Sequence, residues 1–198
     1  MTTTYQIINN IRRMKNILIS NTKGGVGKSL IADELAFSFE IADTPYNFYD
    51  LDSQGGTLHR TSKKENAIVS VIDTPATLND QLGQWISSAD LIIIPTRTTS
   101  RDIEPLKRMI EIVNRNNNKC NVLYVLNAFN RWRASNDFYE WLSRYVNNAI
   151  LTLPQSELFV QASAYRKSIV DYAPKSKATF AILELCNKVR EFLNITLE

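Results

Sequence analysis

The sequence has few of the residues that build disulfide frameworks or metal clusters. Its 198 residues include two cysteines and one histidine. Cys120 and Cys186 stand far apart with no CxxC or Cys/His spacing, which predicts ordinary buried thiols and neither a disulfide framework nor a zinc site. His59 lies in a short polar connector without a cluster of potential ligands, so we expect it at the surface rather than on a metal.

Long hydrophobic runs are also absent. The longest apolar stretches, such as LIII at 91–94, have only the length of a buried strand. The first residues lack the apolar core of a signal peptide, so we expect a cytoplasmic protein. Hydrophobic residues make up 44% of the chain, enough for one domain with a sizeable core. A net charge of +3 permits contact with an anionic polymer without requiring it.

Apolar runs of strand length alternate with amphipathic segments of helical period. Strands are predicted at residues 17–20, 46–50, 68–72, 91–95, 122–127 and 149–153, and helices at 28–41, 78–87, 101–116, 135–147 and 176 to about 195. This alternation is typical of a three-layer α/β/α fold with a mostly parallel sheet. We expect a single domain over residues 14–198. Residues 1–13 are either a leader outside this domain or a product of start-codon choice.

Residues 22–29, TKGGVGKS, predict a phosphate-binding loop. The pattern GxxxxGK[ST] is met at Gly27, Lys28 and Ser29, although Thr22 replaces the first glycine. An apolar strand precedes the loop and a helix follows it, which is the setting that phosphate binding at a helix N-terminus requires. We expect Lys28 to bridge the β and γ phosphates and Ser29 to ligate Mg²⁺. The predicted nucleotide-binding residues are Gly24, Gly25, Val26, Gly27, Lys28, Ser29 and Leu30.

An additional lysine, Lys23, stands at the second position of KGGVGKS. The motif resembles the deviant Walker A motif of the ParA/MinD ATPases, P-loop NTPases of the SIMIBI type. In that family the early lysine reaches across a nucleotide-sandwich dimer to the phosphates of the partner subunit. One ammonium neutralises charge within its own subunit, so a second one is explained if another ATP faces it. On its own merits Lys23 could instead be a solvated surface charge.

Downstream motifs extend the resemblance to most of the chain. YDLDSQGG resembles the family's switch I, which implies that Asp52 lies beside the attacking water and the waters around Mg²⁺. IVSVIDTPA resembles a Walker B strand, which implies that Asp73 holds Mg²⁺ through water. Asn127 ends a strand where family members contact the adenine edge, although an asparagine there is also an ordinary cap. By this resemblance Lys23, Lys28 and Asp52 are the catalytic residues.

The stretch DYAPKSKA, near the C-terminus, resembles ParA/Soj proteins and narrows the resemblance to partition ATPases. It implies a weak ATPase that hydrolyses Mg-ATP to ADP and phosphate and forms a homodimer on binding ATP. The implied role is segregation of a plasmid or other mobile element in the bacterial cytoplasm, through nonspecific nucleoid DNA and a ParB-like adaptor. An ATP-switched positioning or recruitment protein without DNA binding stays open. A small-molecule P-loop kinase is a more distant alternative and leaves Lys23 unexplained.

DNA binding depends on basic residues whose pattern departs from that of the family. Gln155 and Leu158 stand where ParA/Soj relatives carry DNA-binding arginines. A patch of about five cations would still give salt-sensitive, sequence-independent binding. Scattered solvated charges are the other interpretation. The candidate DNA-binding residues are Arg131, Arg133, Arg166, Lys167, Lys175 and Lys177.

The last predicted helix carries an apolar stripe from Ile182 to Phe192. Glu184 and Glu191 make its polar face no better than neutral, whereas a helix on a membrane surface favours lysine and arginine there. We therefore expect this helix to pack against the sheet, without stable membrane association.

Overall fold

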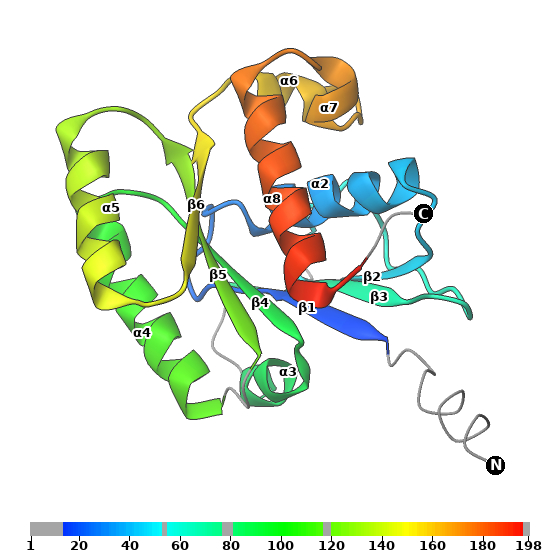
Figure 1. Cartoon of the computed structure of the whole chain (residues 1–198), viewed down its shortest axis with the longest axis horizontal. Helices are drawn as coiled ribbons and strands as arrows, with labels where there is room; N and C mark the ends of the chain where they lie inside the picture. Colours follow the sequence, from blue (N-terminus) through cyan, green and yellow to red (C-terminus); the bar gives the residue numbers. More distant parts are fainter. Residues whose placement is uncertain (1–13, 53–54, 77–80, 117–119, 196–198) are drawn as a thin grey trace.

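A computed structural model of the chain describes residues 14–52, 55–76, 81–116 and 120–195. Within these residues six strands form one sheet in the order β2-β3-β1-β4-β5-β6, and every neighbouring pair is parallel (Figure 1). The strands are β1 Lys15–Ile19, β2 Tyr46–Asp50, β3 Val69–Asp73, β4 Leu91–Thr96, β5 Asn121–Phe129 and β6 Ala149–Pro154. The predicted parallel sheet is confirmed.

Helices cover both faces of the sheet. One layer contains α2 Lys28–Ile41, α6 Leu158–Ala164, α7 Ile169–Tyr172 and α8 Lys177–Leu193, and the other contains α3 Leu82–Ser88, α4 Ser100–Asn116 and α5 Arg133–Tyr145. Side chains alternate along each strand, so Ile17 and Ile19 face the first layer while Leu18 faces the second. The predicted three-layer α/β/α architecture is therefore confirmed.

The element boundaries differ from the predictions in a few places. The helix expected at 78–87 begins at Leu82, and residues 77–80 lie outside the described residues. The helix expected at 135–147 begins at Arg133 and ends at Tyr145. Helices α6 and α7 were not predicted, because each is too short to show a helical period.

The last helix packs as expected. Ile182, Leu185 and Val189 are fully buried in the core beneath α8. The Ser176 side chain accepts a hydrogen bond from the Thr179 N–H and caps the helix start. Within the described part of the chain no helix is long and apolar enough to span a bilayer.

The positions predicted for the two cysteines and the single histidine are only partly confirmed. Cys186 is buried as expected, but Cys120 is half-buried. The expected surface position of His59 is wrong, since only 13% of its side chain is exposed. Its Nδ1 lies 2.7 Å from an Asp33 oxygen and its Nε2 lies 3.6 Å from a Glu40 oxygen. Burial lowers the pKa of His59, but these carboxylates outweigh it and leave the pKa above the usual value.

Helix α2 is tied to the C-terminal part of the chain by Glu34. One carboxylate oxygen accepts a hydrogen bond from the Ser168 hydroxyl at 2.7 Å, and the other accepts from the Ile169 N–H at 2.9 Å. The residue is only 4% exposed, and this burial raises the pKa of Glu34 above the ordinary glutamate value. A buried acid therefore fixes the helix that follows the phosphate loop.

Glu34→Gln tests this anchor through its pH dependence. Because the folded-state pKa of Glu34 is raised, its contribution to stability is complete below the ordinary pKa and is lost as pH rises through the raised value. The amide resembles the protonated carboxyl: its oxygen can accept from the Ile169 N–H and its NH2 can donate to the Ser168 hydroxyl. We therefore expect an unfolding free energy within about 1 kcal/mol of the parent near pH 5. Near about pH 8 the variant should gain on the parent, because the amide does not titrate. Urea unfolding of both proteins at the two pH values measures it.

The matched control is Glu65→Gln, which changes an exposed glutamate. This variant should stay within about 0.5 kcal/mol of the parent at both pH values. A deficit of the Glu34 variant that grows with pH would contradict the assignment.

Candidate nucleotide-binding site

The phosphate loop joins the end of β1 to the start of α2. Gly25 and Gly27 have φ angles of +69° and +102°, in the left-handed region that favours glycine. Asn21 connects the loop to β4. Its amide donates to the Pro95 carbonyl at 2.7 Å, and its side-chain oxygen accepts from the Lys23 N–H at 3.0 Å. The predicted strand, loop and helix are all present, so the backbone amides gather at a helix N-terminus as an anion site requires.

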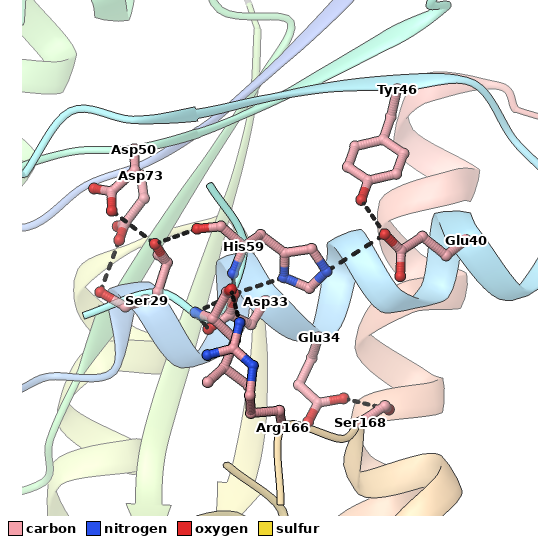
Figure 2. A network of polar contacts seen from close by, with 12 residues as sticks. Ser29, Asp33, Glu34, Glu40, Tyr46, Asp50, His59, Asp73, Arg166 and Ser168 are labelled. Carbon is pink, nitrogen blue, oxygen red and sulfur yellow. Dashed lines mark hydrogen bonds and ion pairs between the residues drawn. The ribbon is translucent and has the colours of Figure 1, made fainter. Parts of the chain in front are cut away.

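Lys28, Ser29 and Asp73 meet at the base of this loop. The Ser29 hydroxyl donates to Asp73 Oδ2 at 2.7 Å (Figure 2). Burial raises the pKa of Asp73 to about 7, although the Ser29 hydrogen bond and Lys28 oppose the rise. Burial lowers the pKa of Lys28, and the nearby Asp73 and Asp52 oppose that. Both charges are costly in this pocket, and each would gain from an added counter-charge.

The same residues fit a magnesium ion bound together with a phosphate. Asp73 Oδ1 is buried and has no hydrogen-bond partner, and the Ser29 hydroxyl lies beside the same carboxylate. Among the described residues, no group of three or more His, Cys, Asp or Glu side chains is placed to hold a metal. Mg²⁺ commonly takes one or two protein oxygens and completes its shell with phosphate and water. When bound it would neutralise phosphate charge.

The segment after β2 lies beside this centre. Asp50 is aligned with Asp73 across the β2–β3 pair, and its carboxylate accepts from the Asp52 N–H at 3.0 Å and the Thr57 hydroxyl at 2.7 Å. The charge of Asp52 acts on Lys28, so the structure brings the predicted switch I acid to the phosphate loop. Gly56 passes so close that a Cβ there would lie 3.1 Å from Ser29 Oγ. Residues 53–54 of the motif lie outside the described residues.

Asn127 braces the phosphate loop from the end of β5. Its amide donates to the Val26 carbonyl at 2.9 Å, and its side-chain oxygen accepts from the Ala128 N–H at 2.9 Å. A Cβ on Gly27 would lie 2.2 Å from the Asn127 nitrogen, so only glycine fits there. In this structure Asn127 therefore caps backbone groups of neighbouring segments, which is the second of its two predicted roles. Its contact with adenine stays a prediction.

A cavity of about 980 Å³ opens beside the loop at the carboxyl ends of β4, β5 and β6. Leu30 and Asn127 line it next to the loop, while Phe138, Trp141 and Phe159 give it apolar walls. Ligands of parallel α/β sheets bind at this end of the strands, and the volume suits a nucleoside. The sequence predicted Leu30 and Asn127 here but not the aromatic residues, two of which lie on α5 and one on α6, without a shared motif.

Lys23 is directed toward the start of α4 rather than into its own phosphate loop. Its ammonium lies 2.5 Å from Asp102 Oδ1 and 3.3 Å from the Arg101 carbonyl. Asp102 is 1% exposed and also accepts hydrogen bonds from the Thr99 N–H and hydroxyl. The Lys23 side chain remains 32% exposed. It is therefore paired within its own chain and still accessible, so it is not simply a solvated charge.

The candidate DNA-binding residues fall into separate groups, all exposed. Arg131 lies between β5 and α5 and Arg133 is the first residue of α5, while the other four follow α6, up to Lys177 at the first position of α8. Two have other partners: Arg166 donates to the Leu58 carbonyl at 2.9 Å, and Arg133 lies 3.6 Å from an Asp137 oxygen.

Comparison with solved structures finds the same fold in nucleotide-binding proteins. An ATP complex of McdA from Cyanothece has a TM-score of 0.74 at 15% identity, covering 92% of this chain and 97% of that one. MinD from Pyrococcus horikoshii with Mg-ADP has a TM-score of 0.68 at 14% identity, covering 92% and 98%. A putative plasmid partition protein from Borrelia burgdorferi, bound to AMPPNP, has a TM-score of 0.67 at 19% identity, covering 89% and 100%.

No curated protein sequence matches the chain. The family model for the CobQ/CobB/MinD/ParA nucleotide binding domain matches residues 17–169, which include the phosphate loop, Asp52, Asp73 and Asn127. The expected resemblance to ParA/MinD ATPases is thereby confirmed, and the chain belongs to the CobQ/CobB/MinD/ParA nucleotide-binding domain family.

Proposed function

We propose that this chain is a weak ATPase that dimerises on binding Mg-ATP and uses the dimer to segregate DNA through an adaptor of the ParB kind. The observation that carries the proposal is the position of Lys23. It lies in the phosphate loop, yet its ammonium is held by Asp102 outside that loop and its side chain is 32% exposed. A facing subunit could receive it once this one ion pair opens.

The proposed ATPase chemistry assigns a role to each residue at the loop base. Lys28 would neutralise the β and γ phosphates, Ser29 would ligate Mg²⁺, and Asp73 would hold the ion through water. Asp52 would orient the attacking water as a carboxylate base. Two relatives of known structure were solved with ATP and with Mg-ADP, which supports ATP and Mg²⁺ as the ligands. Hydrolysis would release the loops around Asp52 and Asp73, and the dimer with them.

A second candidate function is nucleotide-switched recruitment of a protein without DNA binding. It is favoured by Gln155 and Leu158, which replace the expected arginines, and by the contacts that already engage Arg133 and Arg166. The remaining cations, Arg131 and three lysines of the C-terminal group, would then be solvated surface charges. Both candidates require the ATP dimer, and only the first requires DNA.

Lys23→Ala is the decisive variant for the proposed function. We expect the parent protein to sediment as a dimer with Mg-ATP or a non-hydrolysable analogue, and as a monomer with ADP. Lys23→Ala should bind nucleotide within about threefold of the parent, because Lys28 remains, but should lose the dimer. Lys63→Ala, which removes an exposed lysine whose ammonium lies over the Tyr49 ring, is the matched control and should behave as the parent.

Retention on nonspecific DNA then separates the two candidate functions. DNA segregation requires retention that appears only with ATP, disappears in Lys23→Ala and weakens steeply as salt rises. A dimer that ignores DNA at low salt would leave recruitment as the function. If the parent protein stays monomeric with Mg-ATP, both candidate functions are wrong.

Asp102→Asn tests whether the intrachain ion pair opposes dimerisation. The amide keeps the shape and still accepts from Thr99, but it no longer attracts the Lys23 ammonium as a charge. We expect the ATP dimer to form at a protein concentration about five- to tenfold lower than in the parent, measured by sedimentation equilibrium. If the variant dimerises more weakly, Asp102 instead positions Lys23 for the partner.

Ser29→Ala tests the magnesium assignment. The substitution removes the hydroxyl ligand and leaves Lys28 and the loop backbone unchanged. We expect the increase in ADP affinity on adding Mg²⁺ to fall by about tenfold, with little change in affinity for ADP in EDTA. Ser38→Ala, on the same helix, provides a control for helix stability. Equal losses with and without Mg²⁺ would refute a metal role for Ser29.

A further inference from the structure

The two edge strands of the sheet, β2 and β6, differ in whether another segment of the chain pairs with their outer side. The outer edge of β2 is covered by the chain that follows it, where Phe48 and Ser62 exchange backbone hydrogen bonds of 3.0 and 2.9 Å. The Asn47 side chain accepts from the Lys64 N–H at 2.7 Å and extends this cover. Capping of this kind protects an exposed strand from pairing with another chain.

In the part of the chain that the structure describes, no segment covers the opposite edge, β6, in this way. Among the described residues β6 pairs only with β5, and its sequence AILTLP contains no charge and only a terminal proline. The Gln155 N–H donates to the Phe129 carbonyl, so the odd-numbered residues of this segment direct their backbone groups toward β5. Because backbone directions alternate along a strand, the N–H and C=O groups of Ile150 and Thr152 point away from the sheet.

A groove of about 410 Å³ runs beside these open backbone groups. Figure 1 shows β6 between α5 and α8. Its floor includes Ile150 and Thr152, α5 contributes Tyr139, and α8 contributes Glu184. Tyr139 is 38% exposed and offers apolar surface to a ligand. Glu184 is exposed and makes no ion pair within the described residues, so it presents a carboxylate at the groove.

We propose that the β6 edge binds an extended segment of a partner protein, which adds to the sheet as a further strand. Ile150 and Thr152 would exchange backbone hydrogen bonds with the segment, as in other cases of strand addition. Apolar side chains at alternate positions would contact Tyr139, and a lysine or arginine would face Glu184. The partner segment is thus extended, alternately apolar and basic.

The geometry favours a single strand over a second copy of this chain. The groove has walls from helices on both sides, and a second protomer would bring two helix layers of its own to the same place. Pairing of β6 with β6, added to a nucleotide-dependent dimer through another face, would also generate an open filament. This inference goes beyond the proposed function, because strand addition at β6 needs no nucleotide, and its test is made without one.

Backbone amide exchange gives a direct test. In the full chain we expect the Ile150 and Thr152 amides to exchange much faster than those of Leu151 and Leu153. The probe is a synthetic peptide in which valine alternates with threonine and lysine, and saturation with it should slow the two outward amides about tenfold or more. A counterpart with glutamate in place of lysine should bind at least about tenfold more weakly.

Two variants separate backbone recognition from charge. Thr152→Pro removes an outward N–H, which an edge strand tolerates, and should lower peptide affinity about tenfold, whereas Thr152→Val should bind as the parent. Glu184→Lys, on the exposed face of α8, should reverse the preference to the glutamate peptide. Glu184→Lys leaves the β6 backbone unchanged, so this variant tests the groove even if Thr152→Pro unfolds.

Three results would overturn the proposal. Outward amides that are already protected in the free monomer would mean that the edge is covered. Protection that rises with protein concentration, together with a growing mass and no effect of peptide, would assign the edge to a second copy. If both peptides bind equally well to the parent and to Glu184→Lys, the inference that the partner segment is basic is wrong.

Discussion

The register between β1 and β3 is the constraint on which the nucleotide site depends. Ile19, where the phosphate loop leaves the sheet, is aligned with Asp73, and the Thr74 hydroxyl donates to the Ile19 carbonyl at 3.0 Å. The same strand places Asp73 opposite Asp50 on its other side. A slip of one residue would turn Asp73 to the opposite face of the sheet and separate it from Ser29. Central parallel strands with continuous apolar cores make that slip costly.

This register brings opposite charges together where neither is well solvated. Burial raises the pKa of Asp73 to about 7 and lowers the pKa of the adjacent Lys28. Burial therefore disfavours the charged form of each group, and a counter-charge would stabilise it. Phosphate oxygens suit the lysine and a divalent cation suits the carboxylate, so the two ligands complete each other in this pocket.

The sequence predicted the parts of this structure that are local and missed those that depend on distant neighbours. Each apolar run became a strand, and the loop motif identified Lys28 and Ser29, because both signals lie within a few residues. The short helices α6 and α7 carry no periodic signal. His59 was misplaced because its partners, Asp33 and Glu40, lie on α2, 26 and 19 residues earlier in the chain. The pairing of Lys23 with Asp102 joins residues from different elements in the same way.

A series of hydrogen bonds runs from the nucleotide site to Arg166, in the segment between α6 and α7. Thr57 donates to Asp50 beside Asp73, and the neighbouring Leu58 N–H donates to Asp33 on α2 at 2.8 Å. The Leu58 carbonyl accepts from Arg166, which belongs to the basic segment after α6 (Figure 2). The chain at residues 57–58 is thus held between the helix after the phosphate loop and that segment. Leu58, which directly follows Thr57, is thus the residue that contacts both Asp33 on α2 and Arg166.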